Sequence, residues 1–155
     1  MPFAEWSDEF SVGVEEIDRD HKRLLGLLND LQKAVEAGER REVLGKLLDE
    51  LIHYTNYHFA HEEALFLRTN YPGYRAHERK HQALTTTAHA IREDFQLSAS
   101  MALPPQVLEF VKNWLCEDIL GADRDFGAYF NALQDSLEAQ ARPAGEPASL
   151  DRHGA

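Results

Sequence analysis

The sequence predicts an all-α protein, folded as an up-down-up-down four-helix bundle with an N-terminal extended arm and a short C-terminal helix. Three observations lead to this fold class. Apolar residues recur at helical spacing in four long segments. Strong helix breakers separate these segments. No segment alternates strictly between apolar and polar residues, as a half-buried strand would.

The N-terminal segment, residues 1–17, contains apolar side chains without helical spacing and is predicted to pack as an arm across the helices. Asp18 suits the N-cap of a first helix over residues 19–37, and Gly38 suits its C-terminal stop. One turn before its apolar stripe, the inward face of this helix reaches His21. The stripe itself consists of Leu24, Leu28, Leu31 and Val35.

The second and third helices are predicted over residues 40–69 and 74–97, with the breaker Asn70-Tyr71-Pro72-Gly73 between them. Both inward stripes contain polar residues among the apolar ones. In the second helix the stripe is Leu44, Leu47, Leu48, Leu51, Tyr54, Thr55, His58, Glu62, Leu65 and Phe66. In the third it is Tyr74, His77, His81, Leu84, Ala88, Ile91 and Phe95.

The fourth helix is predicted to begin at the pair Pro104 and Pro105, because proline suits the first helical position. Gly121 is expected to end it, and a shorter fifth helix is expected over residues 124–137. The residues from Gln140 onward include almost nothing apolar. We therefore expect one domain over residues 1–138 and a disordered tail over 139–155. The inward stripe of the fourth helix is predicted to be Val107, Phe110, Val111, Trp114 and Asp118.

The composition excludes several classes of protein. The chain has 155 residues and a formal net charge of -11, which argues against nucleic acid or an anionic membrane as a partner. A single cysteine, Cys116, rules out an internal disulfide framework. Neither a signal peptide nor an apolar stretch long enough to cross a bilayer is present, so a soluble cytoplasmic protein is expected. The sequence does not indicate a protein partner.

The informative polar residues fall on the inward stripes. His58 and Glu62 are four residues apart, as are His77 and His81, and this spacing places each pair on one face of a helix. Asp123 follows Asp118 by five residues, which is about 140° around an ideal α-helix. A continuous helix would turn Asp123 away, so we expect the chain to turn at Gly121 and to bring Asp123 back into the bundle.

These residues predict a metal site. Unpaired polar groups in a core each cost a few kcal/mol, so a cation is expected among them. Four imidazoles and three carboxylates are too many for one zinc ion, but they suit two iron ions. Carboxylates bridge metals and imidazoles do not, so Glu62 and Asp123 are the expected bridges. The full predicted ligand set is His21, His58, Glu62, His77, His81, Asp118 and Asp123.

Other polar residues are expected to play no direct part. His53, His61 and His89 lie off the stripes and are predicted to be solvated or to lie at the rim of the site, and Glu63 to be at the surface or behind the ligands. A rival di-iron arrangement would use two Glu-x-x-His motifs, Glu50 to His53 and Glu78 to His81. The first motif lies among charged residues and Glu78 lies off the His81 stripe, so we disfavour this arrangement.

Taken together, these motifs resemble the bacterial hemerythrins over about residues 6–137. The matching landmarks are Trp6, Val12-Gly13, Ile17 to His21, His58-Phe59-Ala60-His61-Glu62-Glu63, His77-Glu78-Arg79-Lys80-His81, and Trp114-Leu115 through Asp123. The resemblance implies a non-haem di-iron centre that binds O2 reversibly. His21 and His58 would hold the iron with the open position, and His77 and His81 the other iron. The residues matching the walls of the O2 pocket are Leu24, Trp114, Leu115 and Ile119.

One position departs from the family. Asp118 stands where the family has a fifth histidine, and it either replaces that histidine as an oxygen ligand or falls short of the iron. The leading hypothesis is O2 binding for storage, delivery or sensing, without an enzymatic reaction. Because Asp118 shifts the ligand set toward carboxylates, a di-iron oxidase or peroxidase is the alternative. An iron-binding or redox-sensing module is the third.

Overall fold

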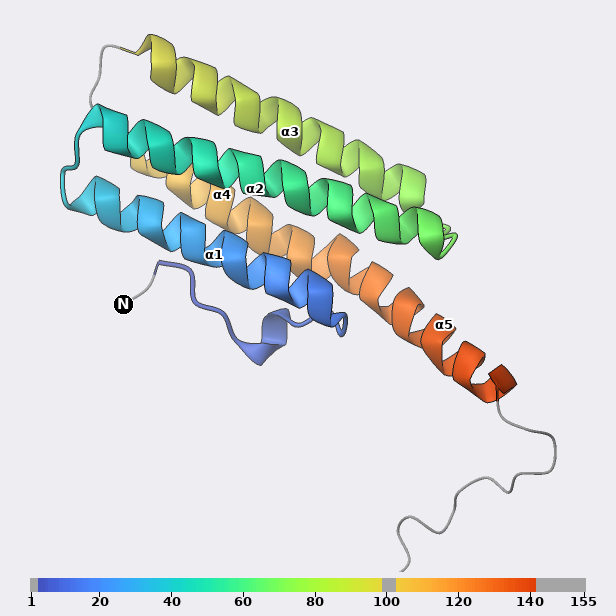
Figure 1. Cartoon of the computed structure of the whole chain (residues 1–155). Helices are drawn as coiled ribbons and strands as arrows, with labels where there is room; N and C mark the ends of the chain where they lie inside the picture. Colours follow the sequence, from blue (N-terminus) through green and yellow to red (C-terminus); the bar gives the residue numbers. More distant parts are fainter. Residues whose placement is uncertain (1–2, 99–102, 142–155) are drawn as a thin grey trace, which may run out of the picture.

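The computed structural model describes residues 3–98 and 103–141, and within these residues all regular structure is helical. Four helices form the bundle seen in Figure 1, and a fifth continues the last of them. Helix α1 packs on α2, α2 on α3, and α4 on α1. The predicted four-helix bundle is confirmed. The helices are α1 (Glu15–Glu36), α2 (Arg41–Arg68), α3 (Tyr74–Leu97), α4 (Pro105–Asp118) and α5 (Arg124–Ala141).

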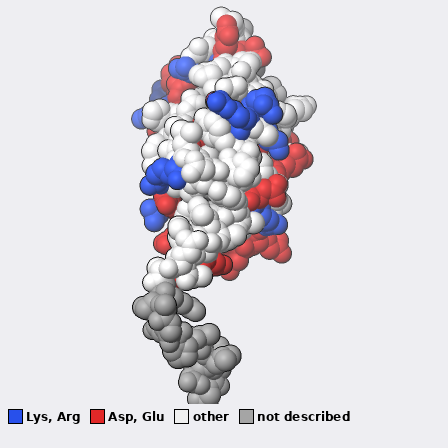
Figure 2. Space-filling view, turned by 90° about the vertical axis from the view of Figure 1, so that its right-hand side faces the viewer, with Lys and Arg blue, Asp and Glu red and all other residues white. Residues whose placement is uncertain are grey.

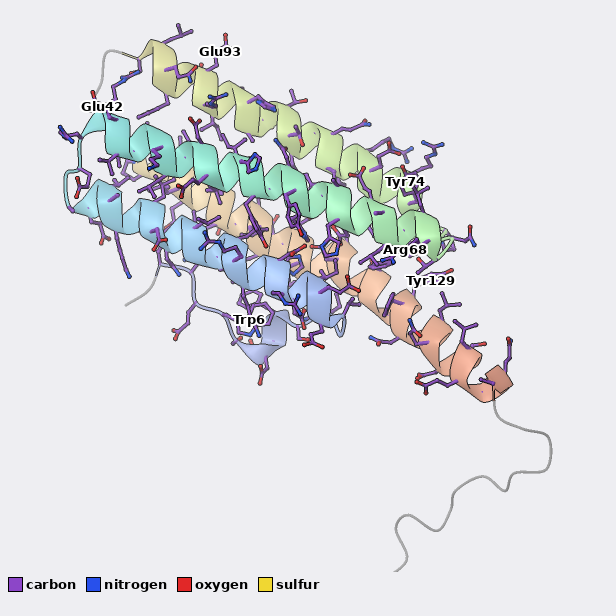
Figure 3. The ribbon with its side chains drawn as sticks, in the orientation of Figure 1. Trp6, Glu42, Arg68, Tyr74, Glu93 and Tyr129 are labelled. Atoms are coloured by element: carbon purple, nitrogen blue, oxygen red, sulfur yellow. The ribbon has the colours of Figure 1, made fainter. Side chains whose placement is uncertain are left out.

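The N-terminal segment forms the predicted arm, which includes a single 3-10 turn, η1 (Asp8–Phe10). It runs along the outer side of α1, where Figure 3 shows Trp6. The Ala4 N–H donates a hydrogen bond of 2.6 Å to the Asn29 side chain. The Lys22 ammonium group lies 5.0 Å from the centre of the Trp6 ring. These contacts hold the arm against the outer side of the first helix, away from the interior of the bundle.

The first helix begins earlier than predicted, and Asp18 is not its N-cap. Val14, which has extended backbone angles, precedes the first helical residue, Glu15. Asp18 lies inside the first turns, and its carboxylate accepts a 2.8 Å hydrogen bond from the Val12 N–H and another from the Ser11 hydroxyl. The carboxylate therefore ties the end of the arm to the helix, instead of capping the helix itself.

The fourth helix presents a different face from the one predicted. Phe110, expected to point inward, is 48% exposed, whereas Leu108 and Leu115 are buried. Apolar residues occur on two sides of this helix, so their spacing alone did not decide which side faces α1. Phe110 and Trp114 instead line a small apolar pocket, with a cavity volume of about 30 Å³, between α2, α3 and α4.

Gly121 does not end a helix. Residues Ile119–Asp123 form one turn of π-helix, η2, and the chain continues directly into α5. The fifth helix reaches Ala141 and projects beyond the bundle, as Figure 1 shows. The rest of the predicted disordered tail, residues 142–155, lies outside the described residues. Gly121 is exposed, and a β-carbon there would meet no atom within 4 Å, so this turn does not require glycine.

Charged side chains on the face in Figure 2 are of both signs and are interspersed around a broad uncharged strip. The predicted metal ligands, in contrast, come from the interior. Within the described residues, none of the helices combines the length and the apolar character needed to cross a membrane.

Candidate metal centre

The interior of the bundle collects polar residues from four elements. His21 comes from α1, His58 and Glu62 from α2, His77 and His81 from α3, and Asp123 from η2. Their exposed fractions are only 0–3%. Each pair spaced four residues apart lies on one inward helix face, as predicted. The ligand atoms form two groups, within each of which all atoms lie within 4.8 Å of one another: Glu62, His77, His81 and Asp123 in one, and His21, His58 and Asp123 in the other.

The imidazoles present their Nε2 atoms to the two carboxylates. His21 Nε2 lies 2.9 Å from Asp123 Oδ2, and His77 Nε2 lies 2.8 Å from Asp123 Oδ1. His81 Nε2 lies 3.2 Å from Glu62 Oε2, while His58 and His77 each lie 3.6 Å from that oxygen. Asp123 therefore faces both groups through different oxygens, and Glu62 lies between histidines of both.

Several of these buried atoms lack a hydrogen-bond partner among the described residues. They include both oxygens of Glu62, both ring nitrogens of His77 and of His81, and Asp123 Oδ1. His77 Nε2 and Asp123 Oδ1 are 2.8 Å apart but are not aligned for a hydrogen bond. An unpaired buried polar group costs about 1–3 kcal/mol, so the set would be unfavourable without a cation. The Nε2 atoms of His21 and His58 are 3.2 Å apart. Two nitrogens about 2.1 Å from one ion, at a right angle, would have nearly that separation. The donor set fits metal ions.

Burial sets the protonation of these groups. It lowers the pKa of His58, and it lowers the pKa of His81 to about 3, with His77 adding to the effect. Both rings are therefore neutral, the form that binds metals. Burial also raises the pKa of Glu62, and the nearby Asp123 carboxylate raises it further. Burial opposes ionisation of Asp123 too, but its contacts with His21 and His77 hold its pKa well below the usual value.

The π-turn explains how Asp123 reaches the site. In a π-helix the hydrogen bonds join residues five apart, so each turn takes up more residues than in an α-helix. Within this turn the buried residues are Ile119 and Asp123, so Asp123 lies on the side of the chain that Ile119 buries in the bundle. The sequence-based argument placed Asp123 correctly but for the wrong reason, because it assumed a break in the helix at Gly121.

Asp118 is the predicted ligand that the structure does not bring into either group. Its side chain is half-buried in a groove between α3 and α4, beside Lys80, Leu84 and Trp114. Burial raises its pKa to about 6, and the Asp123 carboxylate contributes in the same direction. Asp118 thus lies close enough for the Asp123 carboxylate to raise its pKa, while its oxygens stay outside the ligand groups.

Of the four residues that resemble O2-pocket walls, three are buried and the fourth is linked to a ligand through one aromatic ring. Leu24, Leu115 and Ile119 are buried in the core. Trp114 is half-buried and meets Phe59 edge to face, with ring centres 6.2 Å apart. Phe59 in turn stacks on His81 at 3.9 Å. Their role as walls for O2 stays a prediction.

The residues predicted to stand aside mostly do so. His53, His89 and Glu50 are exposed, and Glu78 pairs with Arg75 at 3.2 Å, so the rival Glu-x-x-His arrangement does not form. Glu63 Oε2 lies 3.7 Å from His81 Nδ1, behind that ligand. His61 lies at the rim, as expected, but it contacts a residue that the sequence argument had overlooked.

That overlooked residue is Asp20, which is only 4% exposed. Its Oδ2 lies 3.0 Å from His58 Nδ1 and 2.7 Å from His61 Nδ1. Contacts with His58 and His61 lower the pKa of Asp20 although burial opposes this. Likewise, contacts with Asp20 and Glu16 raise the pKa of His61 against the effect of burial. Asp20 directly precedes His21 and lies four residues before Leu24 of the inward stripe, and the sequence argument used neither signal.

The fold and these residues define a class: helical bundles whose interior holds a metal site of histidines and carboxylates. Comparison with known proteins identifies the family. Residues 12–139 match the hemerythrin HHE cation-binding domain, and the chain belongs to that family.

Individual relatives agree with this assignment. The chain is 31% identical over 142 residues to a bacteriohemerythrin of Stenotrophomonas maltophilia strain R551-3, covering 92% of this chain and 89% of that protein. A bacteriohemerythrin of Pseudomonas aeruginosa strain LESB58 is 27% identical over 152 residues, covering 98% and 95%. A crystal structure of wild-type hemerythrin matches with a TM-score of 0.76 and 28% identity, covering 81% of this chain and 96% of that one.

Proposed function

We propose that this protein holds two iron ions and uses them to bind O2 for storage, delivery or sensing. The observation that supports a pair of ions is the position of Asp123, whose two oxygens face different histidines, His21 and His77, at 2.9 and 2.8 Å. A carboxylate placed in this way suits a bridge between two metals.

In this proposal the ions differ in their surroundings. His21 and His58 hold one ion, and His77 and His81 hold the other. Glu62 and Asp123, which lie close to histidines of both pairs, would be the ligands shared by the two ions. The iron pair supplies the electrons with which O2 is held reversibly. Each ion would then have two imidazoles and the two shared carboxylates as protein ligands, and this leaves room for O2 because iron takes five or six ligands.

The chain's own apolar residues protect the site. Leu24 and Ile119 have exposed fractions of 1% and 0%, and with Leu115, also buried, they would exclude water if they wall the site as the resemblance implies. Low water content would limit proton transfer to bound O2 and so favour its release unchanged. This supports reversible binding in preference to a reaction.

A specific observation favours the second candidate, a di-iron oxidase or peroxidase. Asp118 stands where the resemblance implies a fifth histidine, yet it lies outside both ligand groups. The ion held by His77 and His81 then has one imidazole fewer, and its free side would admit a second molecule such as peroxide.

Anaerobic loading with iron(II) tests the proposal. We expect about two irons per chain and a visible absorption band that forms with O2 and disappears when O2 is removed under inert gas. A plateau at one iron per chain, or preferential retention of zinc from an equimolar mixture, would contradict the di-iron site. A band that bleaches irreversibly while a reductant is consumed would favour the oxidase.

A further inference from the structure

One of the four site histidines differs from the others in what contacts its second ring nitrogen. His58 Nδ1 lies 3.0 Å from Asp20 Oδ2. The Nδ1 atoms of His21 and His77 are buried without a hydrogen-bond partner among the described residues. His81 Nδ1 is 3.7 Å from the nearest Glu63 oxygen, which is too far for a hydrogen bond. Only His58, within this set, has a close carboxylate behind it.

The Asp20 carboxylate is itself held from three sides. Its Oδ2 contacts the Nδ1 atoms of both His58 and His61, and its Oδ1 accepts a 3.3 Å hydrogen bond from the Tyr54 hydroxyl. An ionised carboxylate only accepts hydrogen bonds, so each ring nitrogen that it contacts must carry a hydrogen. His58 then has its hydrogen on Nδ1, and the lone pair of its Nε2 points toward His21 and the site.

The charge of Asp20 is compensated from the surface side. His61 Nε2 lies 3.0 Å from Glu16 Oε2, so both ring nitrogens of His61 face carboxylates and donate to them. The chain of contacts therefore runs from the interior to the surface. The exposed side-chain fractions along it rise from 2% at His58 to 5% at Asp20, 23% at His61 and 45% at Glu16.

We propose that Asp20, held in place by His61, is a positioning residue that fixes the hydrogen of His58 on Nδ1 and so presents Nε2 to the metal pair. The proposal deepens the proposed function and rests on it for the identity of the ion. A ring that donates its second N–H to a carboxylate is also a stronger metal ligand. The ion held by His21 and His58 would thereby be favoured in its more oxidised form.

A purely structural role is the competing explanation. Asp20 and Glu16 belong to α1, whereas His58 and His61 belong to α2, so the same contacts would also clamp two neighbouring helices. A clamp would affect the stability of the fold without affecting the tautomer of His58 or the metal affinity of folded molecules. The test therefore measures both the tautomer of His58 and the metal affinity of the folded protein.

The experiment uses the full chain in four forms: wild type, Asp20→Asn, His61→Gln and the control His53→Gln, which alters an exposed histidine of the same helix. Nitrogen-15 NMR of the metal-free protein reports which ring nitrogen of His58 carries the hydrogen. Titration with Co²⁺, followed by its visible absorption, reports metal affinity. Asp20→Asn is expected to give a mixture of His58 tautomers and to weaken Co²⁺ binding about 10–100-fold. His61→Gln should act in the same direction, and His53→Gln should change neither.

Two results would overturn the proposal. One is a folded Asp20→Asn protein with the His58 hydrogen still on Nδ1 and unchanged Co²⁺ affinity. The other is a lower melting temperature with unchanged affinity of the folded molecules, which would leave Asp20 as a helix clamp. If Asp20→Asn does not fold, His61→Gln decides by the same two measurements. Because neither readout involves iron or O2, failure here is distinct from failure of the di-iron proposal.

Discussion

The Nε2 atoms of His21 and His58 lie 3.2 Å apart in the interior of the bundle, although the residues belong to different helices. The opposite nitrogen of His58 lies 3.0 Å from Asp20, so with the proposed hydrogen on Nδ1 its Nε2 offers a lone pair to the space shared with His21. Two nitrogens that converge in this way without water around them are stabilised by a cation that binds both.

Metal binding should therefore stabilise the fold. At a free metal concentration 100 times the dissociation constant, a single site adds about 2.7 kcal/mol to the free energy of unfolding. We expect the melting temperature to rise when iron(II) is added anaerobically to chelator-treated protein and to fall again with excess chelator. Thermal unfolding followed by circular dichroism measures this, and an unchanged melting temperature at saturating iron would contradict a metal site in the core.

The two carboxylates should matter more than any histidine outside the ligand groups. Glu62→Ala or Asp123→Ala removes a ligand shared by both ions, so we expect each variant to lose most of both irons. His53→Ala and His89→Ala alter exposed rings and are the matched controls. Iron per chain, counted after anaerobic loading and desalting, measures the difference. Loss of iron in His53→Ala, with Asp123→Ala unaffected, would show the inward-facing assignment to be wrong.

Helical spacing predicts this site well where both residues belong to one helix. His58 with Glu62, and His77 with His81, follow from a separation of four residues and from the apolar neighbours that mark the inward face. Asp20 was missed although it precedes Leu24 by four residues, because the stripe was extended only to His21, three residues before Leu24. Its contacts arise from the packing of α1 on α2, which the pattern of a single helix does not contain.

The backbone conformation between Asp118 and Asp123 could not be predicted from the spacing of apolar residues either. A π-turn differs from an α-turn in its backbone hydrogen bonds, and neither Leu120 nor Gly121 marks it by residue type. The prediction that Asp123 faces the interior was correct, but the predicted helix break does not occur. The fourth-helix face was misassigned for a related reason, since Leu108 and Phe110 are equally apolar and only packing distinguishes them.

Asp118 should make the stability of the metal-free protein depend on pH. Its pKa is about 6 in the folded protein, against a model-compound value of 3.8, so the folded state binds this proton more tightly than the unfolded state. The destabilising effect of its charge is therefore absent below about pH 4, grows between pH 4 and 6, and is complete above that. At pH 7 Asp118→Asn should raise the free energy of unfolding by about 1–3 kcal/mol.

Urea unfolding at pH 4 and pH 7 measures this difference. The control is Asp135→Asn, which alters an exposed carboxylate of α5 and should have the same stability as the wild type at both values. An Asp118→Asn protein that is no more stable than the wild type at pH 7 would mean that the groove solvates the Asp118 charge fully.

Replacing Asp118 by histidine tests how this position tunes the proposed reaction with O2. A carboxylate beside the irons adds a negative charge that a neutral imidazole lacks, and a nearby charge favours the more positive, oxidised metal ions. Even at an effective dielectric constant near 20, a charge about 5 Å away contributes about 3 kcal/mol. The wild-type diferrous protein should then oxidise readily, and its O2 adduct should decay faster than that of Asp118→His. If Asp118 stays in its groove, the free side of the ion held by His77 and His81 would admit water or peroxide. The wild-type O2 adduct would again decay faster, and a histidine at this position would close the free side.

Stopped-flow measurement of the decay of the O2 adduct compares the two proteins, with Asp118→Asn as the variant that removes the charge without adding an imidazole. A longer lifetime in Asp118→Asn as well as in Asp118→His would assign the effect to charge. A longer lifetime only in Asp118→His would assign the effect to the added ligand. An equal iron content per chain in all three proteins would exclude incomplete loading as the cause. Equal lifetimes in all three proteins would show that Asp118 does not tune the site, and the case for an oxidase or peroxidase, which rests on this residue, would then fail with it.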